Sequence, residues 1–330
     1  MFCQIRRFVN DLKDSFDLTM DFDKHYSQII LCGMGGSAIS GDLVSDMCFD
    51  VPNVCVNVSR YPVLPAWVND ETLVIICSYS GNTWETQAMY EDAVKRGSRV
   101  IVITSGGIIK EIAESRGDLL VCLPNGLQPR QAIGLMIGYI CKILDTATGT
   151  DLERRVSPSL DEAEKFASDL NHNKNNIARD LAEHLHGRIP VIYSDESMGS
   201  VSFRWKTQIS ENSKMVAFNC LMPEFNHNEI VGWSVSSDKT LAPVIIVCET
   251  GSESVRKVTD ACVKILSDYG VDACKVEITG DTRIECILKG VILGDFVSYY
   301  LAIKNSVNPV EVVPIRNLKA EMKNKIKKLF

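Results

Sequence analysis

Short apolar runs rich in β-branched residues recur along the chain and are separated by longer amphipathic stretches. The apolar runs predict strands at residues 28–32, 54–58, 72–77, 99–104 and 119–123 in the first half, and at 189–193, 215–219, 243–248 and 273–278 in the second. The amphipathic stretches predict helices at residues 37–47, 83–96, 131–146, 161–186, 198–212, 252–269, 285–305 and 317–330. Strands that alternate with helices are typical of parallel sheets covered by helices on both faces.

A polar segment at residues 147–160, which contains glycine and proline, separates two halves with a similar order of elements. A length of 330 residues agrees with two domains. We therefore predict an α/β protein with domains at residues 1–153 and 154–330, each a doubly wound, flavodoxin-like parallel sheet flanked by helices. The halves show no detectable sequence repeat, so their similarity rests on element order alone.

Three hydroxyl residues and a glycine follow the strand at 72–77, in the segment Ser78-Tyr79-Ser80-Gly81-Asn82-Thr83. The next helix starts there, so unpaired backbone N–H groups and the positive end of the helix dipole face the loop. Ser78, Ser80 and Thr83 add hydroxyl donors, and the glycine lets the backbone approach an anion. The loop lacks the lysine of nucleotide P-loops, and we interpret it as a site for a phosphomonoester such as a sugar phosphate. The alternative is that these residues only cap the helix.

A second loop of small residues, Gly33-Met34-Gly35-Gly36-Ser37-Ala38, follows the strand at 28–32. Because the carboxyl ends of parallel strands share one edge of the sheet, we expect Gly35, Gly36 and Ser37 to line the same ligand crevice. The spacing of the loop also satisfies a relaxed dinucleotide-binding fingerprint. Arg60 follows the second strand where that fingerprint requires an acidic residue, so an NADP-binding Rossmann enzyme is a second alternative.

The composition narrows the class of protein. Acidic residues outnumber basic ones, 42 to 35, and no basic stripe with interleaved aromatic residues occurs, so we expect no nucleic acid as a partner. The twelve cysteines form no C-x-x-C pair, and Cys32, Cys77, Cys122 and Cys248 lie in apolar runs typical of buried free thiols. We find no signal peptide, no apolar run of about 18 residues and no metal-ligand spacing, and we expect a cytoplasmic protein that binds neither a membrane nor a metal.

Two segments of the second half combine dense polar side chains with apolar flanks. Residues 205–214 contain Glu211, and residues 223–229 contain His227 and Glu229. Burying such groups is costly unless they are paired or functional, which makes these three residues candidates for chemistry. The alternative is that Glu211 is a solvated helix end and that His227 only follows a helix-capping asparagine.

Five motifs occur together in one order: Gly35-Gly36-Ser37, Ser78-Tyr79-Ser80-Gly81-Asn82-Thr83, Pro129-Arg130, Ser210-Glu211-Asn212-Ser213-Lys214 and Asn226-His227-Asn228-Glu229. In their order and spacing the chain resembles, over residues 28–319, the bifunctional phosphoglucose/phosphomannose isomerases of the sugar isomerase (SIS) superfamily. The hydroxyl loop is common to that superfamily, whereas the pairing of the last two motifs is specific. The resemblance implies two SIS domains and a cofactor-free aldose–ketose isomerase. It would interconvert glucose 6-phosphate and mannose 6-phosphate with fructose 6-phosphate through a cis-enediol.

The resemblance also implies roles for single residues. Glu211 matches the base that moves a proton between C2 and C1, and His227 matches the acid/base that opens the sugar ring. Arg130, which follows the substrate-binding Pro129, matches the arginine that stabilises the enediolate. Lys319 matches a C-terminal lysine assigned to ring opening. A sugar-phosphate-binding SIS protein without catalysis is the alternative, because it needs only the two loops.

The family further implies a homodimer in which His227 reaches the active site of the partner. Phe225, Ile230, Val231 and Trp233 surround His227, and we expect them to form the core of the dimer interface. The alternative is that they pack within their own domain and that His227 serves its own site.

Overall fold

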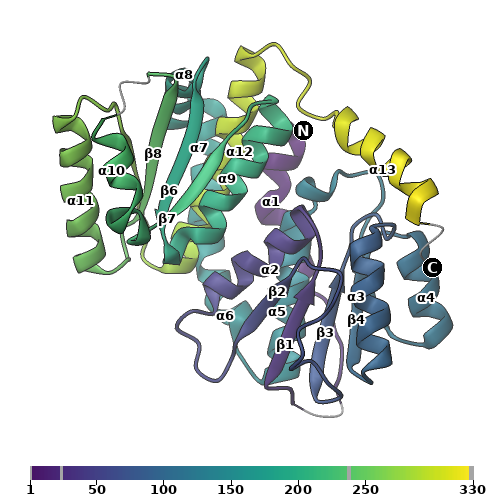
Figure 1. The fold of residues 1–330 in the computed structure, drawn as a ribbon. Helices are drawn as coiled ribbons and strands as arrows, with labels where there is room; N and C mark the ends of the chain where they lie inside the picture. The colour runs from purple at the N-terminus through teal and green to yellow at the C-terminus, as the bar shows by residue number, and fades with distance from the viewer. Residues whose placement is uncertain (1, 23–24, 236–238, 327–330) are drawn as a thin grey trace.

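The computed structural model describes residues 2–22, 25–235 and 239–326. Over these residues the chain folds into two α/β domains, each with a parallel sheet between layers of helices (Figure 1). This confirms the fold class that the sequence predicts. The predicted boundary at 153/154 falls within the short helix α6 (Leu152–Val156), and it stays a prediction.

The N-terminal sheet has the strand order β2-β1-β3-β4-β5, and all neighbouring strands are parallel. Its strands are β1 (Gln28–Cys32), β2 (Val56–Ser59), β3 (Thr72–Cys77), β4 (Arg99–Thr104) and β5 (Leu119–Cys122). This is the flavodoxin-like order, in which the strand order reverses between β1 and β3. Open α/β sheets bind ligands outside the carboxyl ends of the strands at that point.

The C-terminal sheet has the order β7-β6-β8-β9, again with parallel neighbours. Its strands are β6 (Ile189–Asp195), β7 (Phe218–Met222), β8 (Leu241–Cys248) and β9 (Cys274–Ile278). In both domains the first strand therefore lies between the second and the third. In the described part of the chain β7 is an edge strand, and its outer side has no partner strand.

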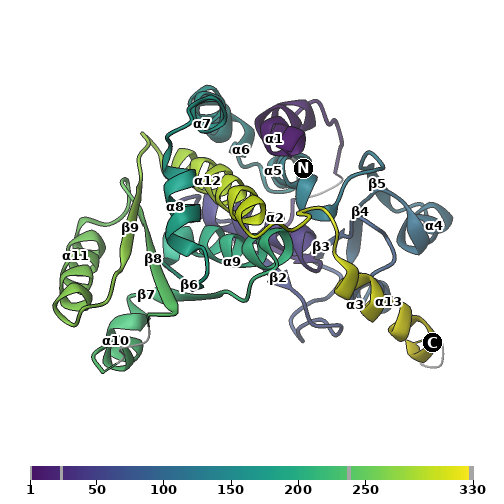
Figure 2. The ribbon, with the colours of Figure 1, turned by 90° about the horizontal axis from the view of Figure 1, so that it is seen from above.

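Helices cover both faces of each sheet (Figures 1 and 2). On the faces turned toward the other domain lie α2 (Gly36–Met47), α5 (Ile133–Thr148), α8 (Ile177–Leu185), α9 (Gly199–Ser213) and α12 (Arg283–Lys304). On the outer faces lie α3 (Trp84–Lys95), α4 (Gly107–Arg116), α10 (Glu229–Trp233) and α11 (Glu253–Asp268). The further α-helices besides α6 are α1 (Phe2–Ser15), α7 (Leu160–His172) and α13 (Val313–Ile326).

α12 is long and apolar enough, by length and composition, to cross a bilayer, which the sequence analysis did not expect. However, 83% of its apolar stretch is buried inside the protein. It contacts α9, α8 and α7, so it has the surroundings of a core helix of the C-terminal domain.

Two predictions near the junction of the domains are wrong for local reasons. The helix predicted at 161–186 is interrupted between α7 and α8. There the Asn176 side chain starts a new helix by accepting a hydrogen bond from the Arg179 N–H. The predicted linker at 147–160 is largely helical, since α6 is followed by a 3-10 turn at Ser157–Ser159.

Other differences concern the ends of elements. The strand predicted at 215–219 lies at Phe218–Met222, because Lys214 ends α9 in a left-handed conformation with φ 58° and residues 215–217 lead into the strand. Helix α1 is not among the helices predicted from the sequence. The predicted tail helix begins earlier, at Val313, and the last four residues of the prediction lie outside the described residues.

The twelve cysteines are free thiols, as the sequence indicates. Cys32, Cys77 and Cys248 are buried, whereas Cys122 is exposed at the end of the short strand β5. Burial in the apolar core raises the pKa of the Cys77 thiol to about 12, so this thiol stays protonated near neutral pH.

The two domains are joined by a carboxylate cap at the ends of α2 and α9. The Asp46 carboxylate, near the end of α2, accepts a hydrogen bond of 2.9 Å from the Ser200 N–H in the first turn of α9. A carboxylate at a helix N-terminus is stabilised by the helix dipole. Even so, burial raises the pKa of Asp46 to about 6, although hydrogen bonding to Ser200 opposes the rise. Keeping Asp46 ionised at this position therefore costs the free energy of removing its charge from water.

We expect Asp46→Asn to stabilise the protein near neutral pH. Between the ordinary carboxyl pKa of 3.8 and about 6, the folded state holds a proton that the unfolded state has lost. The free energy of unfolding of the wild type therefore falls as the pH rises through this window. The amide still accepts the Ser200 hydrogen bond but has no charge to desolvate. In thermal unfolding the variant should melt above the wild type at about pH 7.5, and the difference should shrink toward about pH 4.

Asp50→Asn is the control, because Asp50 lies just beyond α2 and its side chain is 65% exposed. It should leave the melting temperature nearly unchanged. A lower melting temperature of Asp46→Asn at about pH 7.5 would mean that the charge of the cap stabilises the domain interface.

Candidate active site

The hydroxyl loop lies where β3 ends and α3 begins, at the predicted edge of the N-terminal sheet. Gly81 has a left-handed φ of 63°, and a Cβ there would lie 1.7 Å from the Gly106 carbonyl oxygen. Only glycine fits this turn. The Ser37 hydroxyl accepts a hydrogen bond of 3.2 Å from the Tyr79 N–H, so the two loops predicted to share a crevice are in contact.

Helix capping does not account for the hydroxyl groups of this loop. Ser78 is 3% exposed, and its Oγ has no hydrogen-bond partner in the described part of the chain. Thr83 is the N-cap of α3, but its side chain makes no capping hydrogen bond among the described residues. Only the Ser80 Oγ accepts a local bond, 3.3 Å from the Asn82 N–H. Because buried polar atoms are nearly always paired, the Ser78 hydroxyl is a candidate donor to a ligand at this loop.

Tyr79, which the sequence analysis did not single out, connects the hydroxyl loop to the segment that precedes Arg130. Its OH donates a hydrogen bond of 2.7 Å to the Pro124 carbonyl and accepts one of 2.8 Å from the Leu127 N–H. Gly36 packs against the same segment, since a Cβ there would lie 3.1 Å from the backbone of Pro129 and Arg130. The three predicted N-terminal segments therefore meet at one edge of the sheet.

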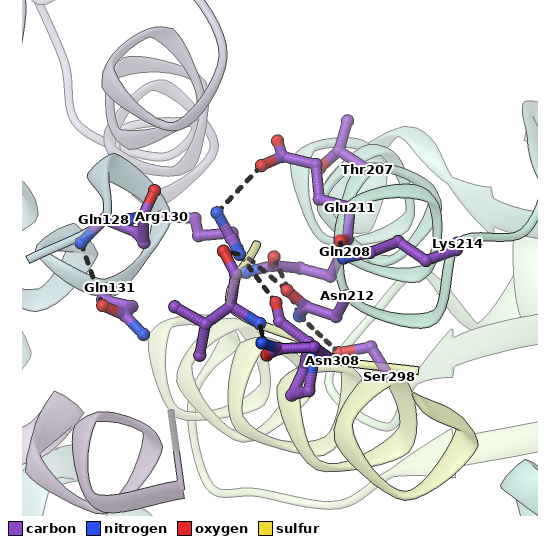
Figure 3. Close-up of polar contacts among 12 residues, drawn as sticks. Gln128, Arg130, Gln131, Thr207, Gln208, Glu211, Asn212, Lys214, Ser298 and Asn308 are labelled. Atoms are coloured by element: carbon purple, nitrogen blue, oxygen red, sulfur yellow. Dashed lines mark hydrogen bonds and ion pairs between the residues drawn. The ribbon is translucent and has the colours of Figure 1, made fainter. Parts of the chain in front are cut away.

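Arg130 and Glu211 form an ion pair across the two domains (Figure 3). The Arg130 Nη1 lies 3.1 Å from the Glu211 Oε2. Arg130 comes from the 3-10 turn η1 (Pro129–Gln131) after β5, and Glu211 comes from the last turn of α9. The Arg130 side chain is 4% exposed and that of Glu211 is 28% exposed, so the carboxylate forms the open side of the pair.

Burial and neighbouring charges act in opposite directions on the charged groups of this site. Burial lowers the pKa of the Arg130 guanidinium, and the Glu211 carboxylate opposes that shift. The Lys214 ammonium donates a hydrogen bond to the Glu211 carbonyl oxygen, and burial together with Arg130 lowers the pKa of this lysine. A carboxylate beside a fixed cation can accept a proton from a carbon next to a carbonyl group, while the cation stabilises the resulting oxyanion.

The structure does not bring the other two predicted catalytic residues to this pair within one chain. His227 is exposed at the end of the 3-10 turn η4 (Glu224–His227), beyond the carboxyl end of β7. Glu211 precedes the amino end of the same strand. Lys319 is exposed on α13, which leaves the body of the chain (Figure 2).

The predicted interface core around His227 is wrong in part. Phe225 and Trp233 are buried in their own domain, with the Phe225 ring 4.8 Å from that of Tyr193 and the Trp233 Nε1 donating to the Tyr193 OH. Ile230 packs against the same cluster, and of the four residues only Val231 is largely exposed, at 68%. Phe225 and Trp233 therefore belong to the hydrophobic core beneath α10 and α11.

The dinucleotide alternative finds no support in the surroundings of the first loop. Arg60 is ion-paired with Asp42 of α2 and stacks over the Phe203 ring, so its charge is already neutralised. Among the described residues no group of three or more His, Cys, Asp or Glu side chains is arranged to hold a metal ion.

The comparisons with known proteins agree with this geometry. The profile of a family described as "Bacterial phospho-glucose isomerase C-terminal SIS domain" matches residues 174–322. The chain is 34% identical to a bifunctional phosphoglucose/phosphomannose isomerase of Aquifex aeolicus, over 90% of this chain and 91% of that protein. It is also 32% identical to a D-glucosamine-6-phosphate 4-epimerase of Sulfolobus acidocaldarius, over 72% and 74% of the two chains.

A solved structure shows the same fold. It is the C-terminal domain of glucosamine-fructose-6-phosphate aminotransferase from Francisella tularensis, with a TM-score of 0.72 at 13% identity, covering 94% of this chain and 96% of that one. Similarity along nine-tenths of the sequence, together with the pairing of Arg130 and Glu211, leads to one conclusion. The chain belongs to the bifunctional phosphoglucose/phosphomannose isomerase family of the SIS superfamily.

Proposed function

We propose that this protein is an aldose–ketose isomerase that interconverts glucose 6-phosphate and mannose 6-phosphate with fructose 6-phosphate through a cis-enediol. The observation that carries the proposal is the Arg130–Glu211 ion pair at the same sheet edge as a loop with an unpaired buried hydroxyl group. The pair suits a proton transfer next to a carbonyl group, and the loop suits a phosphate that takes no part in the reaction.

Isomerisation requires one base that reaches two neighbouring carbons. Glu211 takes the proton from C2 of the open-chain aldose, and the C–H electrons form the C1=C2 bond of an enediolate with its charge on O1. Glu211 returns the proton to C1 while the O2 proton moves to O1, which leaves the ketose. Oxidation at C2 and reduction at C1 offset each other, so the step needs no cofactor. C2 is not a stereocentre in the enediol, and glucose 6-phosphate and mannose 6-phosphate therefore share this intermediate.

Arg130 stabilises the charge that develops during this step. Its guanidinium is fixed by burial, so it does not have to reorganise when the oxyanion forms. The partly exposed Glu211 carboxylate stays accessible to the substrate, whose phosphate is held by Ser78, Ser80, Thr83 and the first turn of α3.

The test is to supply fructose 6-phosphate in the presence of EDTA and to quantify both aldose phosphates. We expect glucose 6-phosphate and mannose 6-phosphate to appear, because the proposed groups are side chains rather than metal ions. Glu211→Gln is the control and should turn over about 10²- to 10⁴-fold more slowly, since an amide cannot accept the proton. Loss of activity in EDTA that zinc restores would contradict the metal-free route. In a parallel reaction supplied with D-glucosamine 6-phosphate, epimerisation at C4 in place of fructose 6-phosphate isomerisation would instead ally the chain with the Sulfolobus relative.

We expect Ser80→Ala and Thr83→Ala to act mainly on KM. The hydroxyl groups bind a phosphate that has the same charge in the ground and transition states, the pattern of uniform binding. Losing one hydrogen bond to a charged group should raise KM about 10- to 150-fold. Steady-state kinetics with fructose 6-phosphate measure the effect, and an unchanged KM in both variants would place the phosphate elsewhere.

We further infer a homodimer in which His227 completes the site of the partner. Glu211 and His227 lie beyond opposite ends of β7, and five strand residues span about 17 Å. One chain therefore does not bring both groups to one sugar. The His227 side chain is exposed and has no hydrogen-bond partner among the described residues.

The edge strand β7 and the segments on either side of it carry exposed apolar residues that suit a second copy of the chain. Val216, Phe218, Leu221 and Val231 are 65%, 52%, 36% and 68% exposed. An unpaired edge strand with exposed apolar residues is a liability unless it is covered. These residues, rather than Phe225 and Trp233, form the core of the interface that we propose.

Mixing two inactive variants tests the shared site. In a mixed dimer of Glu211→Gln and His227→Ala subunits, one site carries both changes and the other is intact. Random exchange of equal amounts should restore roughly a quarter of the wild-type activity. Mixing Glu211→Gln with Arg130→Met is the matched control, which should restore none because both residues serve the site of their own chain. If the first mixture stays inactive after subunit exchange is shown by mass, His227 acts within its own chain.

A further inference from the structure

Arg130 is held by a larger set of polar groups than its ion pair with Glu211. Its Nε donates a hydrogen bond of 2.8 Å to the Asn212 Oδ1. Its Nη2 donates to the carbonyl oxygens of Pro309 and Val310, at 2.8 and 3.0 Å. Figure 3 shows the side chains of Glu211 and Asn212 close to that of Arg130. An arginine has five N–H donors, and the described residues engage four of them. One N–H, on the Nη1 that faces Glu211, stays available.

The Asn212 amide has no freedom to turn its oxygen away from Arg130. Its Nδ2 donates to the Ser298 Oγ at 2.9 Å and to the Gln208 Oε1 at 3.3 Å. The Ser298 Oγ donates to the Asp295 carbonyl oxygen and therefore accepts from the amide. The Gln208 Nε2 donates to the Asp295 carboxylate at 2.9 Å, which leaves the Gln208 oxygen for Asn212. Each group thus determines the orientation of the next.

A buried ion pair anchors this chain of hydrogen bonds. The Arg204 Nη2 lies 2.8 Å from the Asp295 Oδ2, and the two side chains are 1% and 8% exposed. The same Nη2 donates to the backbone carbonyl of Arg130 at 3.2 Å. Burial raises the pKa of Asp295, while Arg204 opposes that rise. Arg204 and Asp295 therefore connect α9, α12 and the turn that carries Arg130.

We propose that Asn212 is a positioning residue for the isomerisation, which aims the single free N–H of Arg130 at the enediolate oxygen. The inference rests on the proposed function. Without the Asn212 oxygen, the buried Arg130 Nε–H loses its hydrogen-bond acceptor. The guanidinium plane then has to turn so that this N–H finds another acceptor. That rotation removes the free N–H from the oxyanion but leaves the phosphate site untouched. Asn212 consequently affects the transition state more than the bound substrate.

Three alanine variants in the contact between α9 and α12 separate positioning from general stability. Asn212→Ala removes the oxygen that holds Arg130. Ser298→Ala keeps Asn212 but removes the acceptor that orients its amide. Ser213→Ala is the matched control, because Ser213 is 1% exposed and donates to the Ser298 carbonyl without contacting Arg130 or Asn212 side chains. All three lose one buried polar group between the same two helices.

We expect kcat of Asn212→Ala to fall about 10- to 100-fold, which is the scale of one hydrogen bond to a charged group. Its KM should stay within roughly threefold of the wild-type value. Ser298→Ala should lose about 2- to 10-fold in kcat, and Ser213→Ala should keep kcat. Affinity for a phosphorylated hydroxamate that mimics the enediolate should fall in parallel with kcat. Affinity for sorbitol 6-phosphate, which has no carbonyl group, should stay at the wild-type value in all three variants.

Hydrogen exchange of the Arg130 Nε–H, followed by ¹⁵N NMR of arginine-labelled protein, gives a readout that needs no turnover. It should be slow in the wild type and in Ser213→Ala, and fast in Asn212→Ala. Unchanged kcat in Asn212→Ala, or an equal loss in Ser298→Ala and Ser213→Ala, would overturn the proposal. If Asn212→Ala does not fold, the comparison of the two serine variants decides. A wild-type protein that isomerises no sugar phosphate contradicts the proposed function, and the exchange data then show separately whether Asn212 holds Arg130.

Discussion

Arg130 is a charged side chain buried between two domains, and the rest of the site depends on how it is satisfied. A guanidinium stays protonated, so its donors have to find partners inside the protein. Arg130 belongs to the N-terminal domain, but the side chains that bind it belong to α9 of the C-terminal domain. Docking of the domains therefore brings the Glu211 carboxylate and the Arg130 guanidinium together. An isolated domain would hold only one half of this ion pair.

The two domains use one architecture, and the anion site that we propose lies in the N-terminal one. Both sheets place the first strand between the second and third, and both α2 and α9 begin with a Gly-Ser pair. Asp195 is the last residue of β6 and Glu249 is the first residue after β8, and the negative charges of these two residues disfavour a phosphate there. The N-terminus of α9 is moreover occupied by the Asp46 carboxylate of the other domain. An internal anion thus occupies the position in the C-terminal half that corresponds to the anion site we propose in the N-terminal half.

The C-terminal segment is connected to the site through backbone atoms. The carbonyl groups of Pro309 and Val310 accept hydrogen bonds from Arg130, and α13 begins three residues later. This contact fixes where α13 leaves the body of the chain, while Lys319 on that helix stays exposed. Arg130 and Glu211, which we propose to act on C1 and C2, are thus assembled within one chain. His227 and Lys319, which the resemblance assigns to ring opening, are exposed on the surface.

The sequence by itself determined the element types and the loops at the strand ends. These depend on local properties: the run Leu73 to Cys77 is apolar on both faces, and Gly81 allows a left-handed turn. The motif around Glu211 also identified the family, because its order along the chain is a property of the sequence. Only the tertiary structure decided which atoms pair. Arg130 meets Glu211 across 81 positions of sequence. Asn212 receives its role from α12, and the aromatic residues near His227 pack inward on Tyr193. Such contacts depend on how α9 and α12 dock against the other elements, and no local pattern encodes the relative placement of segments so far apart.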